Sequence, residues 1–356
     1  PSRGNLLEAD AEALVNTVNC VGFMGKGIAL QFKRAWPENL RMYERACRAH
    51  DLHPGAMLVF ETGRYVNPKY IINFPTKRHW KGKSKIEDIE SGLVALVDEI
   101  TRREIKSVAV PPLGCGNGGL DWEVIRRIII TAFEQAPNVR VLLYAPIGAP
   151  DAKTMPVRTD RPKMTVARAL LTKLMEQYCS LAYRLTLLEI QKLGYFAQEA
   201  GEPLKLNYQR GHYGPFAPNL NQLLGRIEGH FIRGLGDSPK RDQPIELLSG
   251  ATNEAELFLE EFHESQARLT RVAELIEGFE TPYGMELLSS VHWVAIHEES
   301  KAQDAEAAIA AIHGWTSRKE RMFKPNHIRI AWDRLLKLDW LASSHNRIKD
   351  NSEVHH

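Results

Sequence analysis

Apolar residues in the first half of the chain come in short runs, separated by segments in which they recur at helical spacing. Short runs bounded by Gly, Pro or Asn predict strands, and the amphipathic segments predict helices. The predicted strands span residues 13–18, 57–61, 70–75, 107–111 and 140–144, and the predicted helices span 27–35, 40–50, 85–103 and 122–135. This alternation predicts an α/β fold with a mixed sheet flanked by helices.

The pattern changes after residues 145–163, a proline-rich segment that predicts a linker. Beyond it, residues 165–198 and 253–279 carry apolar side chains at helical spacing, which predicts a mostly α-helical second part. A chain of 356 residues is long enough for two domains. We therefore expect an α/β domain over residues 1–155 and an α-rich domain over residues 156–350.

The charge of the chain is unevenly distributed. The formal net charge is +2, but residues 1–155 hold 21 Lys or Arg against 17 Asp or Glu, a charge of +4, and the remainder carries −2. Residues 246–280 hold nine Glu and two Arg, a local charge of −7. A basic domain followed by an acidic one predicts different partners for the two.

Other features limit the function classes. No apolar run approaches the ~20 residues of a membrane span, the sequence opens without a charged and then apolar leader, and the four cysteines are scattered without CxxC pairing. The histidines of the second half lack the spacing of a metal site: His263, His292, His297 and His313. We expect a cytoplasmic protein with no membrane partner, no metal and no cofactor.

Two glycine-rich segments each follow a predicted strand and precede a predicted helix. Residues 16–30 read NTVNCVGFMGKGIAL, and residues 111–122 read PPLGCGNGGLDW. Glycines let the backbone approach an anion, and the amides at a helix N-terminus point toward it. Together the loops could clamp a diphosphate, although either loop alone could serve only to make a tight turn.

With the opening phrase GNLL and the strand ALVNTVN, these loops resemble the macrodomain family over about residues 3–150. The resemblance implies that ADP-ribose is the ligand, with the Asn19 amide on the hydroxyls of the distal ribose. Turn capping at the end of the strand is the alternative role for Asn16 and Asn19. The implied ligand-binding residues are Asn5, Leu6, Asn16, Asn19, Gly25, Lys26, Gly27, Ile28, Gly114, Cys115, Gly116, Asn117, Gly118, Gly119 and Leu120.

Within that family, the phrases MGKGIALQFK, FPTK and LGCGNGGLDW resemble the branch of DNA ADP-ribosyl glycohydrolases and related terminal-ADP-ribose hydrolases. In that branch the lysine of the middle phrase is catalytic, and it corresponds to Lys77. Cleavage of an N-glycosidic bond develops positive charge at the anomeric carbon of ribose. A neutral amine could attack that carbon, or its ring-opened aldehyde form, to give a covalent intermediate. Such an amine needs a lowered pKa, from neighbouring cations or from burial. The alternative is that Lys77 only binds nucleic-acid phosphates.

A cationic run follows Lys77 and includes one aromatic residue. Cations beside an aromatic ring attract phosphate and offer a platform for a nucleobase, so we expect single-stranded DNA to lie across this run. The alternative is a solvated surface loop. The candidate DNA-binding residues are Arg78, His79, Trp80, Lys81 and Lys83.

Two positions differ from the related macrodomains. Many of them have Asp after the opening Gly, where it accepts a hydrogen bond from adenine, whereas this chain has Asn5. The animal terminal-ADP-ribose hydrolases use an Asp in the second loop, at about the position of Gly118, and here Asp121 follows three residues later. Because Asp121 also fits the N-cap of the next helix, we favour catalysis by Lys77 without a carboxylate.

The second domain carries the phrases KLGYFAQ at residues 192–198 and YGP at residues 213–215. Over about residues 170–248 it resembles antitoxin domains of the SocA-like type. The resemblance implies a protein-binding module whose partner is a DarT-like DNA ADP-ribosyltransferase toxin. An acidic helix within residues 246–280 could enter the basic DNA groove of such a toxin as a DNA mimic. An amphipathic helix with a solvated acidic face is the alternative.

These inferences combine into one hypothesis. The protein is expected to be an antitoxin whose first domain hydrolyses the bond between ADP-ribose and thymine in single-stranded DNA, and whose second domain binds the toxin. One alternative is an ADP-ribose reader without turnover. Another is a hydrolase of protein-linked or O-acetyl-ADP-ribose.

Overall fold

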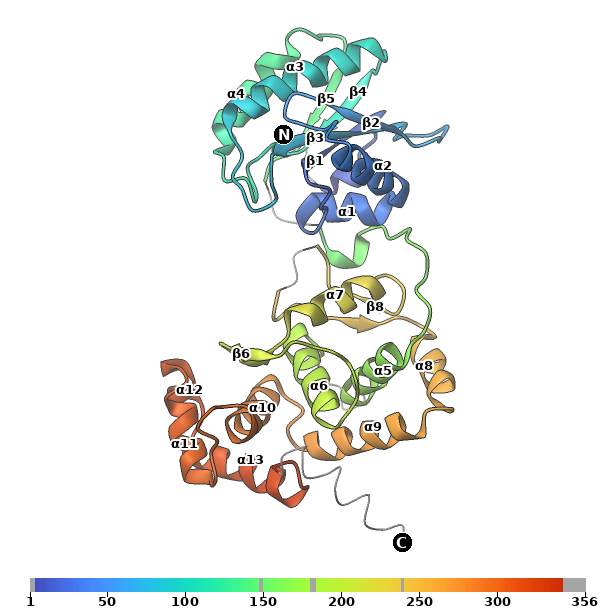
Figure 1. Cartoon of the computed structure of the whole chain (residues 1–356). Coiled ribbons are helices and arrows are strands. Elements are labelled where there is room, and N and C mark those ends of the chain that lie inside the picture. Colours follow the sequence, from blue (N-terminus) through green and yellow to red (C-terminus); the bar gives the residue numbers. More distant parts are fainter. Residues whose placement is uncertain (1–3, 147–149, 180–183, 238–239, 342–356) are drawn as a thin grey trace. The chain divides into compact units, whose positions relative to one another are not determined.

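The computed structural model of the chain describes residues 4–146, 150–179, 184–237 and 240–341. The chain forms two compact units (Figure 1). The first runs to Asp160 and also contains Gly236 and Asp237, and the second contains most of the remainder. Within the first unit, Gln31 Nε2 donates to Asp237 Oδ2 (2.7 Å) and Arg34 Nη1 donates to the Gly236 carbonyl oxygen (2.8 Å).

The first unit contains one five-stranded mixed sheet in the order β2-β3-β1-β4-β5. Strand β2 is antiparallel to β3, and the other neighbouring strands are parallel. The strands are β1 (Ala13–Asn19), β2 (Leu58–Glu61), β3 (Tyr70–Lys77), β4 (Ser107–Val110) and β5 (Arg140–Leu143). The helices are α1 (Gly27–Ala35), α2 (Pro37–Arg48), α3 (Ile86–Arg102) and α4 (Trp122–Phe133), with short 3₁₀ turns η1 (Leu6–Glu8) and η2 (Ala152–Thr154).

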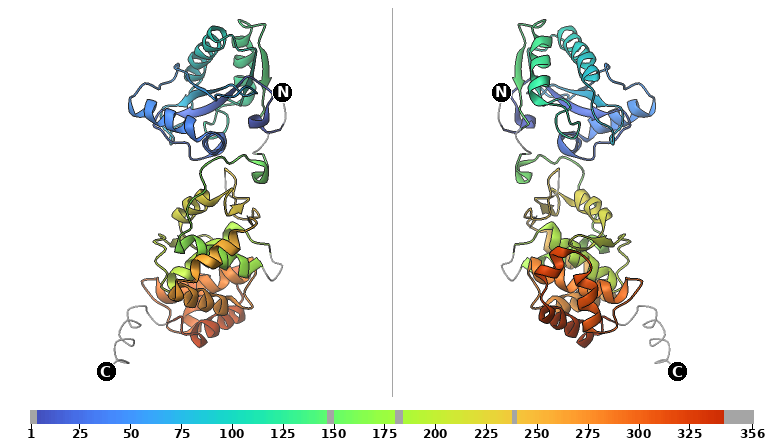
Figure 2. Two further views of the ribbon diagram at one scale, coloured as in Figure 1. Left: turned by 90° about the vertical axis from the view of Figure 1, so that its right-hand side faces the viewer. Right: turned by 90° about the vertical axis from the view of Figure 1, so that its left-hand side faces the viewer.

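Helices cover both faces of this sheet (Figures 1 and 2). Because side chains alternate along a strand, β1 directs Val15 toward the cluster that α3 and α4 complete with Leu93 and Ile125. Its neighbour Leu14 packs on the other face against Phe32 of α1. The predicted α/β fold with a mixed sheet flanked by helices is confirmed.

The described part of the second unit is mostly helical, as the sequence predicts. The helices are α5 (Val166–Cys179), α6 (Leu187–Glu199), α7 (Pro218–Ile227), α8 (Ala251–Leu259), α9 (His263–Ile276), α10 (Pro282–Ile296), α11 (Ala305–His313), α12 (Ser317–Met322) and α13 (Pro325–Lys337). Two small hairpins pair β6 (Gln209–Gly211) with β7 (Gly214–Phe216) and β8 (Ile232–Arg233) with β9 (Glu246–Leu247). One apolar core joins the helices, with Phe196 and Trp340 fully buried in it.

The two segments with helical spacing in this half each hold parts of two described helices. Residues 165–198 cover α5 and all but the last residue of α6, and Thr186, which is extended and pairs with Pro244 in a β-bridge, starts α6 with a capping box. Residues 253–279 cover most of α8 and all of α9, and the Phe262 ring between them stacks on Phe258 at 5.2 Å. The predicted helical character of this half is confirmed.

Several predicted segments extend outside the described residues: residues 1–3 of the first domain, 147–149 of the linker, 180–183 of the helical segment 165–198, and 238–239 and 342–350 of the second domain. Across the described ranges, the structure has no helix both long and apolar enough to cross a membrane.

Candidate functional site

Three loops leave the same edge of the sheet in the first unit. Strands β1, β3 and β4 are parallel, so their carboxyl ends lie side by side, and ligands commonly bind at such an edge. The loops after β1 and β4 are the two glycine-rich segments, and the loop after β3 is the cationic run. At the end of this edge a β-bulge after Val18 brings Asn19 into register with Lys77. The topology thus gathers motifs separated by up to about a hundred residues.

Asn19 organises the first loop. Its Nδ2 donates to the Phe23 carbonyl oxygen (2.6 Å), and its Oδ1 accepts from the Val21 amide (2.9 Å) and the Tyr43 hydroxyl (2.9 Å). The bonds to Phe23 and Val21 are those of the predicted turn-capping alternative. Gly25 is required for a different reason, since a Cβ there would lie 2.2 Å from the Phe23 ring.

Asn16 lies beneath the site and is fully buried. Its Nδ2 donates to Asn73 Oδ1 (2.9 Å), and Asn73 Nδ2 donates to Asn39 Oδ1 (2.7 Å). Three buried amides therefore connect β1, β3 and α2. This geometry gives Asn16 a positioning role below the loops, and its predicted contact with the ligand stays a prediction.

The second loop is packed as tightly as the first. The Ser84 amide donates to the Gly118 carbonyl oxygen (3.1 Å), so the start of α3 supports the loop. A Cβ on Gly118 would lie 2.1 Å from the Gly114 carbonyl oxygen and 2.3 Å from Ser84 Oγ. On the side facing the first loop, a Cβ on Gly27 would lie 3.7 Å from Asn117 Nδ2. The two predicted loops therefore do face each other across a narrow space.

This packing predicts the effect of one added methyl group. Gly118→Ala is expected to lower the free energy of unfolding by about 1–3 kcal/mol, because backbone must move to admit the Cβ, and to weaken ADP-ribose binding. Thermal denaturation and calorimetry measure the two effects. Gly116→Ala is the matched control for stability, since a Cβ at Gly116 meets no atom within 4 Å. Equal stability of the two variants would contradict the prediction.

Lys77 ends β3 with its ammonium directed at the second loop. Its Nζ donates to the Asn117 carbonyl oxygen. Burial lowers the pKa of Lys77 from its usual value. The sequence offers neighbouring cations or burial as the cause of a lowered lysine pKa, and in the structure the cause is burial. A partly buried amine with a lowered pKa now stands between the two glycine-rich loops.

The cationic run after Lys77 is exposed at its predicted DNA-binding residues. Trp80 is 49% exposed and stacks on His79, with 5.6 Å between the ring centroids. Lys81 Nζ lies 5.0 Å from the centroid of the Trp80 ring. Phe23 of the first loop, 55% exposed, lies 5.7 Å from Trp80. Arg78 pairs with Asp88 (3.0 Å), and Lys83 is exposed. The cations of the run and the exposed rings of Trp80 and Phe23, the latter from the first loop, therefore lie together beside Lys77.

The two positions that depart from related macrodomains have local partners. Asn5 caps η1 by accepting from the Leu7 amide (3.0 Å) and donates to Glu8 Oε1 (3.2 Å). Asp121 caps α4 by accepting from the Val124 amide (3.0 Å), as expected. This engagement supports a structural role for Asp121.

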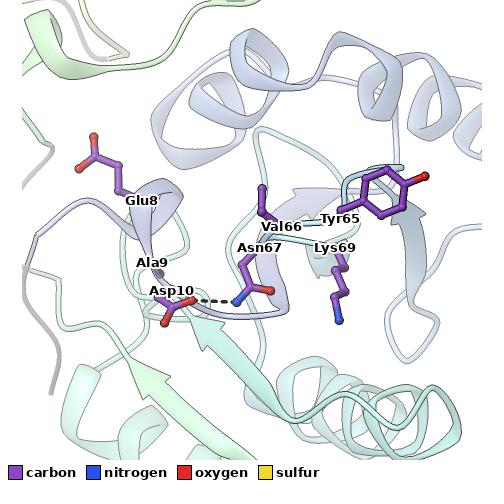
Figure 3. Close-up of a pocket in the computed structure, with 7 residues that line it drawn as sticks. All are labelled: Glu8, Ala9, Asp10, Tyr65, Val66, Asn67 and Lys69. Atoms are coloured by element: carbon purple, nitrogen blue, oxygen red, sulfur yellow. Dashed lines mark hydrogen bonds between the residues drawn. The ribbon is translucent and has the colours of Figure 1, made fainter.

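A separate cavity of about 570 Å³ lies at the other edge of the sheet, before the first residues of β1 and β3 (Figure 3). Asn67 Nδ2 donates to Asp10 Oδ1 across it (2.8 Å), and Tyr65 lies on its rim, fully exposed. None of its lining residues belongs to the predicted site.

One group of possible metal ligands comes together among the described residues, and it lies in the second unit. Glu199, His292 and His297 place their donor atoms within 4.8 Å of one another. Spacing could not reveal it, because Glu199 is distant in sequence from the two histidines and these are five residues apart. Spacing along the chain therefore does not decide whether these histidines bind a metal.

Comparison with known proteins identifies the family. The Macro domain model matches residues 15–129. The DNA ADP-ribosyl glycohydrolase of Thermus aquaticus is 46% identical over 335 residues, which are 94% of this chain and 92% of that protein. The chain belongs to the DNA ADP-ribosyl glycohydrolase family. The predicted membership and the predicted class of enzyme, a hydrolase, are confirmed.

Two further relatives of this glycohydrolase family match part of the chain. A DNA ADP-ribosyl transferase-DNA ADP-ribosyl glycohydrolase fusion protein of Thermosipho africanus is 32% identical over 170 residues, 43% of this chain and 44% of the fusion. The solved macrodomain of Mycobacterium tuberculosis DarG is 55% identical, covering 41% of this chain and 95% of that one with a TM-score of 0.41. The SocA-like resemblance of the second part stays a prediction.

The sequence predicts neither Phe23, Ser84 nor Asn73 as part of this candidate site. Phe23 has no periodic signal because it is a ring in a glycine-rich loop, and Ser84 follows the cationic run without a signal of its own. Asn73 was overlooked although a buried amide inside the apolar strand YIINFPTK is itself a signal.

Proposed function

We propose that the first unit removes ADP-ribose from a base of single-stranded DNA, with thymine as the modified base and Lys77 as the nucleophile. The observation that carries the proposal is Lys77, an amine with a lowered pKa, on the carbonyl of Asn117 between two facing glycine-rich loops. The names of the family's relatives, DNA ADP-ribosyl glycohydrolases, support DNA as the substrate. The fusion of transferase and glycohydrolase in Thermosipho africanus supports a DarT-like enzyme as the source of the modification.

The chemistry follows from this arrangement. The two loops hold the diphosphate through backbone amides, with the distal ribose toward Asn19 and Lys77. The neutral amine of Lys77 bonds to the anomeric carbon as the bond to the base nitrogen breaks, and the base leaves with the bonding electrons and takes a proton from water. Water then attacks the same carbon, releasing ADP-ribose and regenerating the amine.

The test uses a single-stranded oligonucleotide carrying ADP-ribosyl-thymine. Wild-type protein is expected to release free ADP-ribose, as measured by chromatography, while calorimetry records binding of ADP-ribose itself. Binding without release would make the protein a reader. Release only from protein-linked or O-acetyl-ADP-ribose would assign a different substrate. Either result would reject the proposal.

Phe23 and Trp80 are proposed to hold the nucleobases of the strand. Stacking of a base on an aromatic side chain contributes about 1–3 kcal/mol. Phe23→Ala and Trp80→Ala are therefore expected to lower kcat/KM on the oligonucleotide roughly tenfold or more, without changing affinity for free ADP-ribose. Tyr65→Ala removes a fully exposed ring at the other edge of the sheet and is the matched control. An equal effect of all three variants, or none, would contradict base stacking.

We also propose that the second unit binds the toxin, with the acidic residues of α8 and α9 as the contact. Part of the acidic charge is already paired, since Arg161 contacts Glu254, Lys173 contacts Glu256 and Arg268 contacts Glu264. Outside these pairs, exposed carboxylates remain on α9 at Glu274 and on the segment between the helices at Glu260 and Glu261. Their field would steer a basic DNA-binding groove toward this surface.

Charge reversal tests this contact. The triple variant Glu260→Lys, Glu261→Lys and Glu274→Lys is expected to weaken binding of a DarT-like toxin at least tenfold and to slow association most at low salt, since charged rims act mainly on association rates. Calorimetry and stopped-flow mixing measure these effects. Glu306→Lys on α11 is the control. Unchanged toxin affinity in the triple variant would contradict this contact and support the alternative, an amphipathic helix whose acidic face is simply solvated.

A further inference from the structure

A cluster of two imidazoles and a carboxylate joins α6 to the end of α10 in the second unit. Glu199 is the last residue of α6, His292 lies inside α10, and His297 caps the C-terminus of α10. His297 keeps right-handed helical backbone angles (φ −108°, ψ −14°), and its ring stacks on Trp293, one turn earlier, at 4.7 Å. His297 Nε2 lies 3.0 Å from Glu199 Oε1.

The buried histidine of the cluster is oriented for coordination. His292 Nε2 lies 3.1 Å from the Trp340 carbonyl oxygen, which can only accept, so Nε2 carries the proton and Nδ1 holds a lone pair. The donor atoms of His292, Glu199 and His297 lie within 4.8 Å of one another, and Nδ1 is the His292 nitrogen that has a lone pair to offer. A second hydrogen bond from a ligating histidine to a backbone carbonyl is the usual outer-shell arrangement at metal sites.

Tyr195 completes the surroundings. Its hydroxyl lies 2.7 Å from His292 Nδ1, and since Nε2 of His292 carries the proton, the hydroxyl donates to Nδ1. The next carboxylate along the chain, Glu298, is engaged by Arg210 and by the Trp293 indole (3.1 Å each). The cluster therefore consists of two imidazole donors and one carboxylate.

We propose that Glu199, His292 and His297 bind one divalent transition metal ion, with Zn²⁺ the best match. Two nitrogens and one oxygen suit Zn²⁺ and exclude Mg²⁺ and Ca²⁺, which take oxygen ligands. At metal–ligand bonds of about 2.0–2.2 Å, tetrahedral ligand atoms stand roughly 3.3–3.6 Å apart. Glu199 Oε1 and His297 Nε2, 3.0 Å apart, would therefore separate slightly, and any donor pair near the 4.8 Å limit would draw closer. Binding of the metal at His292 Nδ1 would replace the hydrogen bond from the Tyr195 hydroxyl. His297, about one-third exposed, leaves a fourth position for water.

The ion would act as a clip between α6 and α10. Both helices belong to the main core of the second unit, where Phe196 packs edge-on against the His292 ring (5.8 Å). A ligand that binds only the folded state stabilises it by mass action. Metal loading is therefore expected to raise the melting temperature of the second unit. This inference is independent of hydrolysis in the first unit.

The test titrates Co²⁺ and Zn²⁺ into the full, chelator-treated chain. Every protein carries His355→Ala and His356→Ala, so that those imidazoles do not contribute. The parent is expected to bind one Zn²⁺ by calorimetry, to melt at a higher temperature with Zn²⁺, and to give the visible bands of four-coordinate Co²⁺ without a thiolate charge-transfer band.

Ligand variants decide the assignment. His297→Gln and Glu199→Gln are expected to weaken Zn²⁺ binding at least about tenfold and to lose the Zn²⁺-dependent rise in melting temperature. His327→Gln is the matched control, because its exposed ring also bonds a tyrosine hydroxyl, that of Tyr283 (2.7 Å). The proposal is overturned if the parent binds no Zn²⁺, if a thiolate band appears, or if His297→Gln binds as tightly as His327→Gln.

Discussion

Replacing Lys77 with Ala is expected to reduce release of ADP-ribose from ADP-ribosylated single-stranded DNA by about a thousandfold or more, the scale seen when a nucleophile is removed. Affinity for free ADP-ribose is expected to change little, because the proposed ligand contacts come from the two glycine-rich loops. Single-turnover assays and calorimetry measure these quantities. Equal losses of binding and turnover would instead make Lys77 a phosphate contact.

Lys77→Arg separates the nucleophile from a simple cation. Arginine keeps the positive charge but stays protonated, so this variant is expected to be as inactive as Lys77→Ala. The pH profile gives a second check. Since burial lowers the pKa of Lys77, more of its amine is neutral near pH 7 than in an exposed lysine, and release should rise with pH as the remaining ammonium deprotonates. Substantial activity in Lys77→Arg would falsify the nucleophilic role.

Replacing Glu286 with Ala is expected to destabilise the second unit by about 3–5 kcal/mol, because it leaves the buried Lys319 ammonium without its counter-ion. The Glu286 carboxylate is 2% exposed and accepts from Arg318 Nη1 (2.7 Å) and Lys319 Nζ (2.7 Å). Lys319 is itself fully buried. The surroundings of this ion pair are closely packed, since a Cβ on the nearby Gly214 would lie 3.0 Å from Ser290 Oγ and 3.3 Å from Lys192 Nζ. Denaturant-dependent hydrogen exchange of α10 measures the loss within this unit.

The control and the pH dependence follow from the same ion pair. Glu306→Ala removes an exposed pair with Arg329 and is expected to cost less than about 1 kcal/mol. Burial works to raise the pKa of Glu286, but hydrogen bonds from Arg318 and the charge of Lys319 outweigh it and hold that pKa below its usual value. The stabilisation is thus present at neutral pH and lost on acidification through the folded-state pKa. Similar losses in the two variants would contradict the prediction.

The sequence predicted the elements around the site because their signals are local. Glycines between a strand and a helix, the apolar strands and the N-cap at Asp121 each depend on residues a few positions apart. The helical character of the second half was predicted, but not where its helices begin and end. The β-bridge from Thr186 to Pro244 before α6, and the packing of Phe262 on Phe258 before α9, are not encoded by periodicity.

The sequence by itself determined the α/β order of the first half, the helical character of the second and the residues around which a phosphate-binding site would form. Only the tertiary structure decided which of them meet. The parallel register of β1 and β3 aligns Asn19 with Lys77, and Lys77 reaches Asn117 because β1 and β4 end at the same edge. The pairing of Phe23 with Trp80 and the meeting of Glu199 with His292 likewise join residues far apart in sequence. Such contacts depend on strand register and helix packing, which have no signature in the spacing along one chain.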